Sequence, residues 1–295
     1  MYPPGSMFKT VQALIALEQK QVQVDEIITV NGQLIGDLAP AGRYDIVRAL
    51  TKSSNNYFFK VFRRVIQQGE YLNPFIDSRI GYNNWRNFVL QFGFGNTLNI
   101  DLPNEKLGFI PSLEFYDKIY GKERWKFSNI YSLSIGQGEL LVTPLQMANL
   151  GVILANRGHY HTPHLVRKVG TEVLDFSQKK NIDIDKRHFE TVLDGMQALV
   201  SVPGSRAYIP DLIYCGKTST VENPRGLDHS GFMGFAPRED PKIAIAVYVE
   251  NAGWGARAAL STASLIIEKH INGSVKKKWL ENYVLMGDFE DAKPE

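Results

Sequence analysis

The fold is decided by residues 212–249, which read LIYCGKTSTVENPRGLDHSGFMGFAPREDPKIAIAVYV. Three runs in this stretch, rich in β-branched, aromatic and small residues, predict strands at Leu212 to Thr220, Ser230 to Phe235 and Ile243 to Val249. Turn-forming residues separate the runs, as in Pro-Arg-Glu-Asp-Pro at 237–241. Consecutive strands joined by short turns pair most simply as an antiparallel sheet.

Helical patterns account for much of the remaining chain. Apolar residues recur at helical spacing in residues 7–17, 46–65, 143–155, 186–200 and 258–270. The second of these patterns is interrupted at residues 53–56, Ser-Ser-Asn-Asn, which are poor inside helices and favourable as caps. Residues 83–111 are rich in Gly, Asn and Pro. We therefore expect an α/β chain of the α+β kind, an antiparallel sheet flanked by helices.

Composition narrows the possible partners. The chain has 295 residues, and 33 Lys and Arg nearly balance 31 Asp and Glu, so the formal charge is +2. Such a balance gives no basic face of the kind that binds nucleic acid, and we expect no nucleic-acid partner. The single cysteine, Cys215, excludes an intrachain disulfide and is expected to be a buried strand residue. The sequence contains no run of about eighteen apolar residues, so it predicts no membrane-spanning helix.

One serine and lysine pair has the spacing and the context of a nucleophile and its base. Ser6 precedes Lys9 by three residues, so both side chains lie on one helix face and the amine can take the hydroxyl proton. Only this pair follows a Pro-Pro-Gly turn and opens an apolar helix, whose N-terminus favours a developing oxyanion. Two further pairs with the same spacing lie in Lys-rich segments, Ser177/Lys180 and Ser274/Lys277.

A lysine that acts as a base near neutral pH needs a lowered pKa, which burial or a second cation provides. Lys217 is the candidate for that cation. It lies in a predicted strand in which Thr218 and Thr220 alternate and so share one face. Such a strand edge is suited to a substrate carboxylate, although taken alone it is more often an ordinary polar strand end.

Three short motifs in order resemble a known family. Ser6-Met7-Phe8-Lys9, Ser53-Ser54-Asn55 and Lys217-Thr218-Ser219 are similar to the Ser-x-x-Lys, Ser-x-Asn and Lys-Thr-Gly motifs of penicillin-binding proteins. Residues 2–6, 134–148 and 222–237 also resemble family segments, so the likeness extends to about residue 270. It is closest to the penicillin-binding protein 2 type, the elongation type of class B.

The resemblance implies a fold and a set of roles. The fold would be serine β-lactamase/transpeptidase-like, with an all-helical subregion. Ser6 would attack the penultimate D-Ala of a stem peptide, Lys9 would accept the proton, and Ser53 would relay it to the departing amine. Asn55 would hold the peptide. Lys217, Thr218 and Ser219 of the third motif would bind substrate. The backbone N–H of Thr220 would form an oxyanion hole together with that of Ser6.

The resemblance also implies the setting of the whole protein. Residues 1–295 would form one transpeptidase domain, truncated on its N-terminal side so that sheet elements are missing and a sheet edge is unpaired, with 271–295 as a C-terminal tail. The implied partners are peptidoglycan stem peptides, β-lactam antibiotics and, for a membrane-anchored full-length protein on the periplasmic side of the inner membrane, a glycosyltransferase of the elongation machinery. No cofactor and no metal are expected.

Other interpretations remain open. The same Ser/Lys chemistry serves a serine β-lactamase or a D,D-carboxypeptidase, in which water takes the acyl group. A fragment that binds β-lactam or muropeptide without turnover is the non-catalytic alternative, because Ser219 stands where the family motif has glycine. His159, His161 and His164 lie close together in the sequence but lack the cysteine or carboxylate partners of a zinc site. Asp228 and His229 lack the Gly-x-Ser-x-Gly motif that accompanies a hydrolase triad.

Overall fold

The computed structural model describes residues 1–287 and 289. Its sheet is antiparallel and has the order β7 (Cys215–Val221), β8 (His229–Ala236) and β9 (Ile243–Val249). Cys215 pairs with Phe235, and Ser230 pairs with Val249. The three predicted strands are confirmed, but the first begins at Cys215 and not at Leu212, whose N–H closes a turn onto Ile209. In the described part of the chain β9 pairs only with β8.

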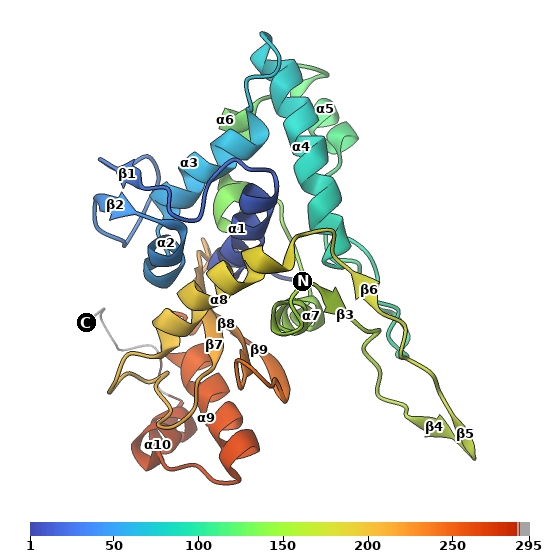
Figure 1. Cartoon of the computed structure of the whole chain (residues 1–295), viewed down its shortest axis with the longest axis vertical. Coiled ribbons are helices and arrows are strands. Elements are labelled where there is room, and N and C mark those ends of the chain that lie inside the picture. The colour runs from blue at the N-terminus through green and yellow to red at the C-terminus, as the bar shows by residue number, and fades with distance from the viewer. Residues whose placement is uncertain (288, 290–295) are drawn as a thin grey trace.

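Helices cover both faces of this sheet, as Figure 1 shows. On one face α9 (Ala258–Asn272) packs against β8 and β9, with α10 (Lys278–Met286) behind it. The other face is covered by α7 (Pro144–Ala155) and α8 (Lys186–Val200). Successive residues of β8 point to opposite faces, so Met233 and Phe235 join one apolar cluster while Phe232 and Ala236 join the other. The expected helix-flanked antiparallel sheet is confirmed.

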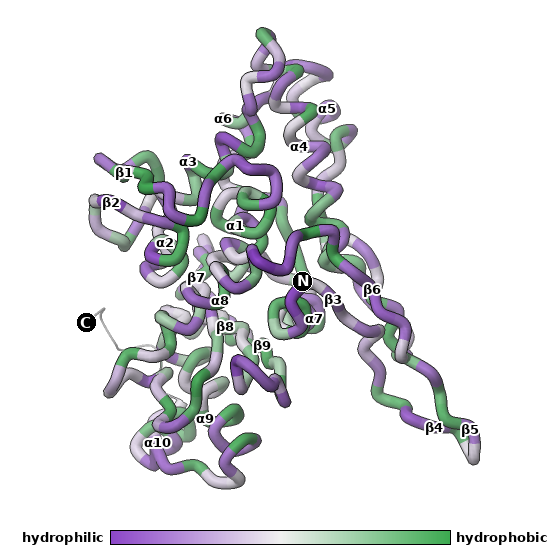
Figure 2. The backbone as a smooth tube through the Cα atoms, viewed as in Figure 1, coloured by the Kyte–Doolittle hydropathy of each residue, from purple (hydrophilic) through white to green (hydrophobic). Residues whose placement is uncertain are grey.

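The central helix of the molecule is α1 (Lys9–Glu18), which is buried along almost its whole length. Gln12, buried on this helix, accepts a hydrogen bond from Trp85 Nε1 at 2.7 Å and donates to the Leu133 carbonyl at 2.9 Å. Figure 2 shows apolar residues concentrated in α1 and α7. These contacts fix α1 against its neighbours and set the position of the residues at its start.

A helical region lies beyond α1 and carries a cluster of packed aromatic rings from α4 and α5. The sequence pattern does not predict the longest helix of this region, which contains Gly81, Asn83 and Asn84, because packing overrides their low helix propensity. The elements of the region are α2 (Ile46–Lys52), α3 (Asn55–Ile66), α4 (Pro74–Gln91), α5 (Leu113–Tyr120), α6 (Phe127–Ile130) and the 3-10 turn η2 (Tyr131–Ile135).

Six short strands lie outside the main sheet and pair antiparallel in twos. The β4–β5 hairpin forms the tip of an arm that projects from the body in Figure 1. The strands are β1 (Ile28–Val30) with β2 (Gly42–Tyr44), β3 (His159–Tyr160) with β6 (Lys180–Asn181), and β4 (Lys168–Val169) with β5 (Glu172–Val173).

The predicted helices within residues 7–17, 46–65, 143–155, 186–200 and 258–270 are confirmed, including the interruption between α2 and α3. Within the predicted tail, 271–295, the structure describes the end of α9 and α10, where Leu280 is buried, whereas residues 288 and 290–295 lie outside the described part. Across the described residues, no helix combines the length and apolar character needed to cross a bilayer.

Candidate active site

Ser6 lies in a tight turn, η1 (Gly5–Phe8), that leads directly into α1. Gly5 has φ +53°, and its N–H donates to the Gly136 carbonyl at 2.8 Å. A Cβ atom on Gly136 would lie 2.2 Å from the Gly5 carbonyl oxygen, so only glycine permits this approach. Gly136 lies in the Gly-Gln-Gly sequence of residues 134–148, one of the stretches that resemble family segments, and this stretch therefore supports the turn that carries Ser6.

Lys9 is fully buried beneath that turn. Its Nζ donates to the Ser53 carbonyl at 2.6 Å, to Ser53 Oγ at 3.2 Å and to Asn55 Oδ1 at 2.5 Å. Among the described residues no hydrogen bond joins Lys9 to the Ser6 hydroxyl. Burial, and next the charge of Lys217, hold the pKa of Lys9 well below its ordinary value, while Asp37 opposes them. The amine is thus suited to accept a proton.

The break between α2 and α3 places Ser53 at the centre of the site. Ser53 has φ 55° and ends α2, and Ser54 begins α3 by accepting a hydrogen bond from the Tyr57 N–H at 3.2 Å. The left-handed backbone conformation of Ser53 turns the chain sharply between the two helices. As a result Ser53 Oγ lies 3.2 Å from Lys9 Nζ and 2.8 Å from Lys217 Nζ.

Lys217 approaches Ser53 from the sheet side. Its side chain is fully buried, and burial lowers its pKa to about 7. Besides Ser53 Oγ, its Nζ contacts the Thr218 carbonyl at 3.1 Å. The structure therefore brings together the predicted residues Lys9, Ser53 and Lys217, which are far apart in the sequence.

Ser219 faces a different direction. It is buried, and its hydroxyl donates to the Pro4 carbonyl at 3.0 Å. Glycines make room for it, since a Cβ on Gly5 would lie 2.2 Å from Ser219 Oγ and one on Gly255 would lie 2.1 Å from the Ser219 carbonyl. The side chain thus lies under the turn before Ser6, not among the cleft-lining residues, and a contact of Ser219 with substrate stays a prediction.

A cleft of about 470 Å³ opens above these residues. Its polar lining residues include Ser6, Ser53, Asn55, Thr218 and Thr220, and its apolar lining residues include Leu199, Val202, Trp254 and Leu260. The two alternate threonines share the cleft, as their spacing predicted, and Thr220 Oγ1 accepts the Gly255 N–H at 3.1 Å. Such a mixed lining is typical of ligand-binding clefts, in which a few polar groups orient the ligand.

Sequence reasoning missed two contributors to the cleft. Asp37 lines it from the loop between β1 and β2, and no local pattern in the sequence marks that loop. Val202, an apolar lining residue, follows the end of α8 and lies in a segment without periodicity. Both contributions come from long-range packing, which a one-dimensional pattern does not carry.

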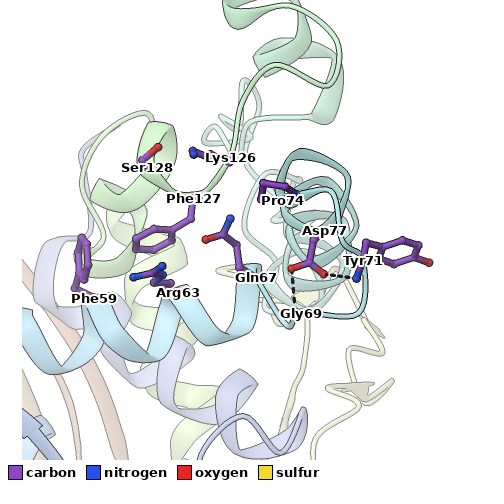
Figure 3. A pocket seen from close by; sticks show the side chains of 10 residues that line it. All are labelled: Phe59, Arg63, Gln67, Gly69, Tyr71, Pro74, Asp77, Lys126, Phe127 and Ser128. Atoms are coloured by element: carbon purple, nitrogen blue, oxygen red, sulfur yellow. Dashed lines mark hydrogen bonds between the residues drawn. The ribbon is translucent and has the colours of Figure 1, made fainter.

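A second cavity, of about 580 Å³, lies between α3, α4 and α6, away from the three motifs. Figure 3 shows Arg63, Gln67 and Phe127 along one side of it and Asp77 on the other. The Asp77 carboxylate accepts the N–H groups of Gly69 and Glu70 at 3.0 and 3.1 Å, so it serves to hold the loop before α4.

In the described residues no group of His, Cys, Asp and Glu is arranged to hold a metal ion. Of the three histidines near residue 160, His161 contacts the Phe176 carbonyl through Nδ1 and His164 stacks on the Phe176 ring. His229 accepts the Asn251 N–H at 3.0 Å, a loop contact.

A helix-flanked antiparallel sheet, with a serine in the turn before the central helix and a buried lysine at the start of that helix, is the arrangement of serine acyl-transferases that use a Ser-x-x-Lys pair. Within that class the chain belongs to the penicillin-binding protein transpeptidase family, since the family model "Penicillin binding protein transpeptidase domain" matches residues 1–271. The predicted family is confirmed.

Relatives of the predicted subtype match the chain. The peptidoglycan D,D-transpeptidase MrdA of Acinetobacter baumannii is 30% identical over 88% of this chain and 41% of its own length, and that of Haemophilus influenzae is 28% identical over 92% and 44%. A crystal structure of Pseudomonas aeruginosa PBP2 has a TM-score of 0.76 at 25% identity, covering 94% of this chain and 61% of that one. This chain spans less than half the length of those curated relatives.

Proposed function

We propose that this chain carries the transpeptidase site of a peptidoglycan D,D-transpeptidase that cross-links stem peptides through an acyl-enzyme on Ser6. The observation that carries the proposal is the fully buried Lys9, which lies one helical turn from Ser6 and whose pKa is held well below its ordinary value. A lowered pKa favours the neutral amine, which is the form that can deprotonate a serine hydroxyl.

In the first half-reaction Ser6 Oγ attacks the carbonyl carbon of the penultimate D-Ala, and its proton passes to Lys9. The C–N bond to the terminal D-Ala then breaks, and the departing amine takes a proton through Ser53. The 3.2 Å separation between Lys9 Nζ and Ser53 Oγ supports this relay. In the second half-reaction the amine of a neighbouring stem peptide attacks the ester, gives up a proton by the reverse route and releases Ser6.

Substrate binding falls to the strand side of the cleft. The hydroxyls of Thr218 and Thr220 would donate to the terminal carboxylate, and the protonated form of Lys217, buried beside Thr218 and Ser53, would add positive charge. Asn55 would hold the peptide backbone, and the N–H groups of Ser6 and Thr220 would stabilise the oxyanion. A β-lactam carries a similar carboxylate and strained amide, so it should acylate Ser6 as the donor peptide does.

The whole protein is proposed to be anchored in the inner membrane with this domain on the periplasmic side, and to work with a glycosyltransferase of the elongation machinery. Membership of the family and likeness to the MrdA relatives support this setting.

The test is an exchange assay with a synthetic stem pentapeptide ending in D-Ala-D-Ala and a D-amino acid acceptor, followed by mass spectrometry. We expect release of D-Ala and a peptide ending in the acceptor, both absent in Ser6→Ala. A tetrapeptide as the only product would instead identify a carboxypeptidase. Stable binding of peptide or β-lactam without any product would identify a non-catalytic binding fragment, and rapid hydrolysis of β-lactams would identify a β-lactamase.

A further inference from the structure

Asp37 lies in the loop between β1 and β2, and its carboxylate is hydrogen-bonded to residues at the start of α3. It accepts hydrogen bonds from Ser54 Oγ at 2.9 Å, from the Asn56 N–H at 2.8 Å and from Asn56 Nδ2 at 3.0 Å. The Ala39 N–H adds a fourth at 3.0 Å within the loop. Ser54 and Asn56 flank Asn55, so the carboxylate holds the second motif from both sides.

The start of α3 holds the loop in return. Asn56 Oδ1 accepts the N–H groups of Leu34 and Ile35 at 2.7 and 3.2 Å, and Asn55 Nδ2 donates to the Gly36 carbonyl. Because the Asn55 amide nitrogen is engaged by the loop, its Oδ1 is the atom left to face Lys9, at 2.5 Å. The orientation of a site amide thus depends on the loop that Asp37 anchors.

The Asp37 carboxylate is also a charge beside the site. Burial raises its pKa, but hydrogen bonds from Asn56, Asn55, Ala39 and Ser54 outweigh burial, and the pKa lies below its usual value. The group is therefore ionised at neutral pH, and the N-terminus of α3 favours the negative charge. Its charge raises the pKa of Lys9, in opposition to Lys217.

We propose that Asp37 is a positioning residue for the acyl-transfer site, which anchors the loop to the second motif and so fixes Ser53 and Asn55 against Lys9. The inference rests on the proposed function, since it concerns the same reaction. Asp37 lines the cleft together with Ser6, but its hydrogen bonds run to the start of α3, so it acts through its neighbours.

The test compares Asp37→Asn and Asp37→Glu with the wild-type chain in the rate of acylation by a fluorescent penicillin, measured across pH and together with the melting temperature. Asp45→Asn is the matched control, because Asp45 caps α2 by accepting the Arg48 N–H at 2.7 Å and does not line the cleft. We expect Asp37→Asn to lower the maximal rate about tenfold or more, as small misplacements in a site do.

The pH profile separates positioning from simple stability. Loss of the Asp37 charge lowers the pKa of Lys9 further, so the rising limb of the rate, which follows deprotonation of Lys9, should move to lower pH in Asp37→Asn. Asp37→Glu keeps the charge but displaces the carboxylate, so it should lose rate with little movement of the limb. Asp45→Asn should lose stability at most, with rate and profile unchanged.

The outcomes distinguish the two proposals. A wild-type chain that is not acylated overturns the proposed function, and the inference with it. A wild-type chain that is acylated, with Asp37→Asn equal to it in maximal rate and in the position of the rising limb, overturns the role of Asp37 alone. Should Asp37→Asn fail to fold, the Asp37→Glu chain decides: an unchanged maximal rate contradicts positioning, and a reduced rate with an unmoved limb supports it.

Discussion

Ser219 replaces the glycine of the family motif, and the structure gives the substitution a physical role. Its hydroxyl satisfies the Pro4 carbonyl just before the turn that carries Ser6, and Gly5, Gly231 and Gly255 leave the space it occupies. The non-catalytic alternative rested on Ser219, because a side chain at this position would crowd the turn that carries Ser6 unless its neighbours leave space. The surrounding glycines relieve that crowding.

We therefore expect Ser219→Gly to lower the free energy of unfolding by about 1–2 kcal/mol, through the lost hydrogen bond and the added backbone freedom, without a faster acylation. Gly5→Ala should be far more damaging, because its Cβ would lie 2.2 Å from Ser219 Oγ.

The double variant tests the coupling between these two residues. Ser219→Gly should partly rescue Gly5→Ala, although the left-handed backbone at Gly5 and the contact with Val221 remain unfavourable. Denaturant unfolding of the two single variants and the double variant measures the coupling. Strictly additive losses would contradict the contact, and a Ser219→Gly chain that is acylated faster would show that the hydroxyl crowds the site.

The two buried lysines make a second prediction at this scale. The charge of Lys217 lowers the pKa of Lys9, so Lys217→Gln should raise the pKa of Lys9 and move the rising limb of acylation to higher pH, opposite to Asp37→Asn. The rate itself should also fall, because the carboxylate site loses its cation. Lys118→Gln, the same charge change at an exposed position on α5, is the control and should leave the limb in place. A limb unmoved in Lys217→Gln would contradict the coupling.

At the scale of elements, the sequence predicted those parts of the site whose residues carry a local pattern. The polar break at residues 53–56 predicted the gap between α2 and α3, and alternation predicted that Thr218 and Thr220 share the cleft. The loop that carries Asp37 has neither periodicity nor a motif. Its place is set by contacts with residues about twenty positions away, which no local propensity records.

The crossing of α3 and α4 is another contact that local sequence patterns do not predict, and a substitution at Gly81 tests it. A Cβ on Gly81 would lie 2.3 Å from the Ile66 carbonyl oxygen, so the two helices approach through this glycine. In an exposed helix Gly→Ala stabilises by about 1 kcal/mol. Here we expect Gly81→Ala to destabilise by about 1–3 kcal/mol, because backbone atoms must move apart. Urea unfolding measures the change, with exposed Asn84→Ala on the same helix as control. A stabilised Gly81→Ala would contradict the close crossing.

At the scale of the whole molecule, the sheet separates two apolar clusters, and the site lies where the sheet meets the helical region. The larger cluster joins α1, α3 and α4 to one face of the sheet, and the smaller one packs α9 against the other. Lys9 lies in the helical region and Lys217 in the sheet, and both contact Ser53 Oγ. The site therefore forms only when these two parts of the molecule are assembled. The order of the motifs predicted which residues would meet. It did not predict what holds them, which is the Asp37 loop, the Ser219 contact and the Gly136 approach.

The central claim is that Ser6 is a nucleophile activated within this assembled chain, and acylation by a β-lactam tests it most directly. The chain is incubated with benzylpenicillin, and intact-mass and peptide mass spectrometry locate the adduct. We predict one added penicilloyl group on the peptide that contains Ser6, stable over minutes, and none in a Ser6→Ala chain that keeps the wild-type melting temperature. An unmodified wild-type chain, or an adduct that persists in Ser6→Ala, would contradict the account.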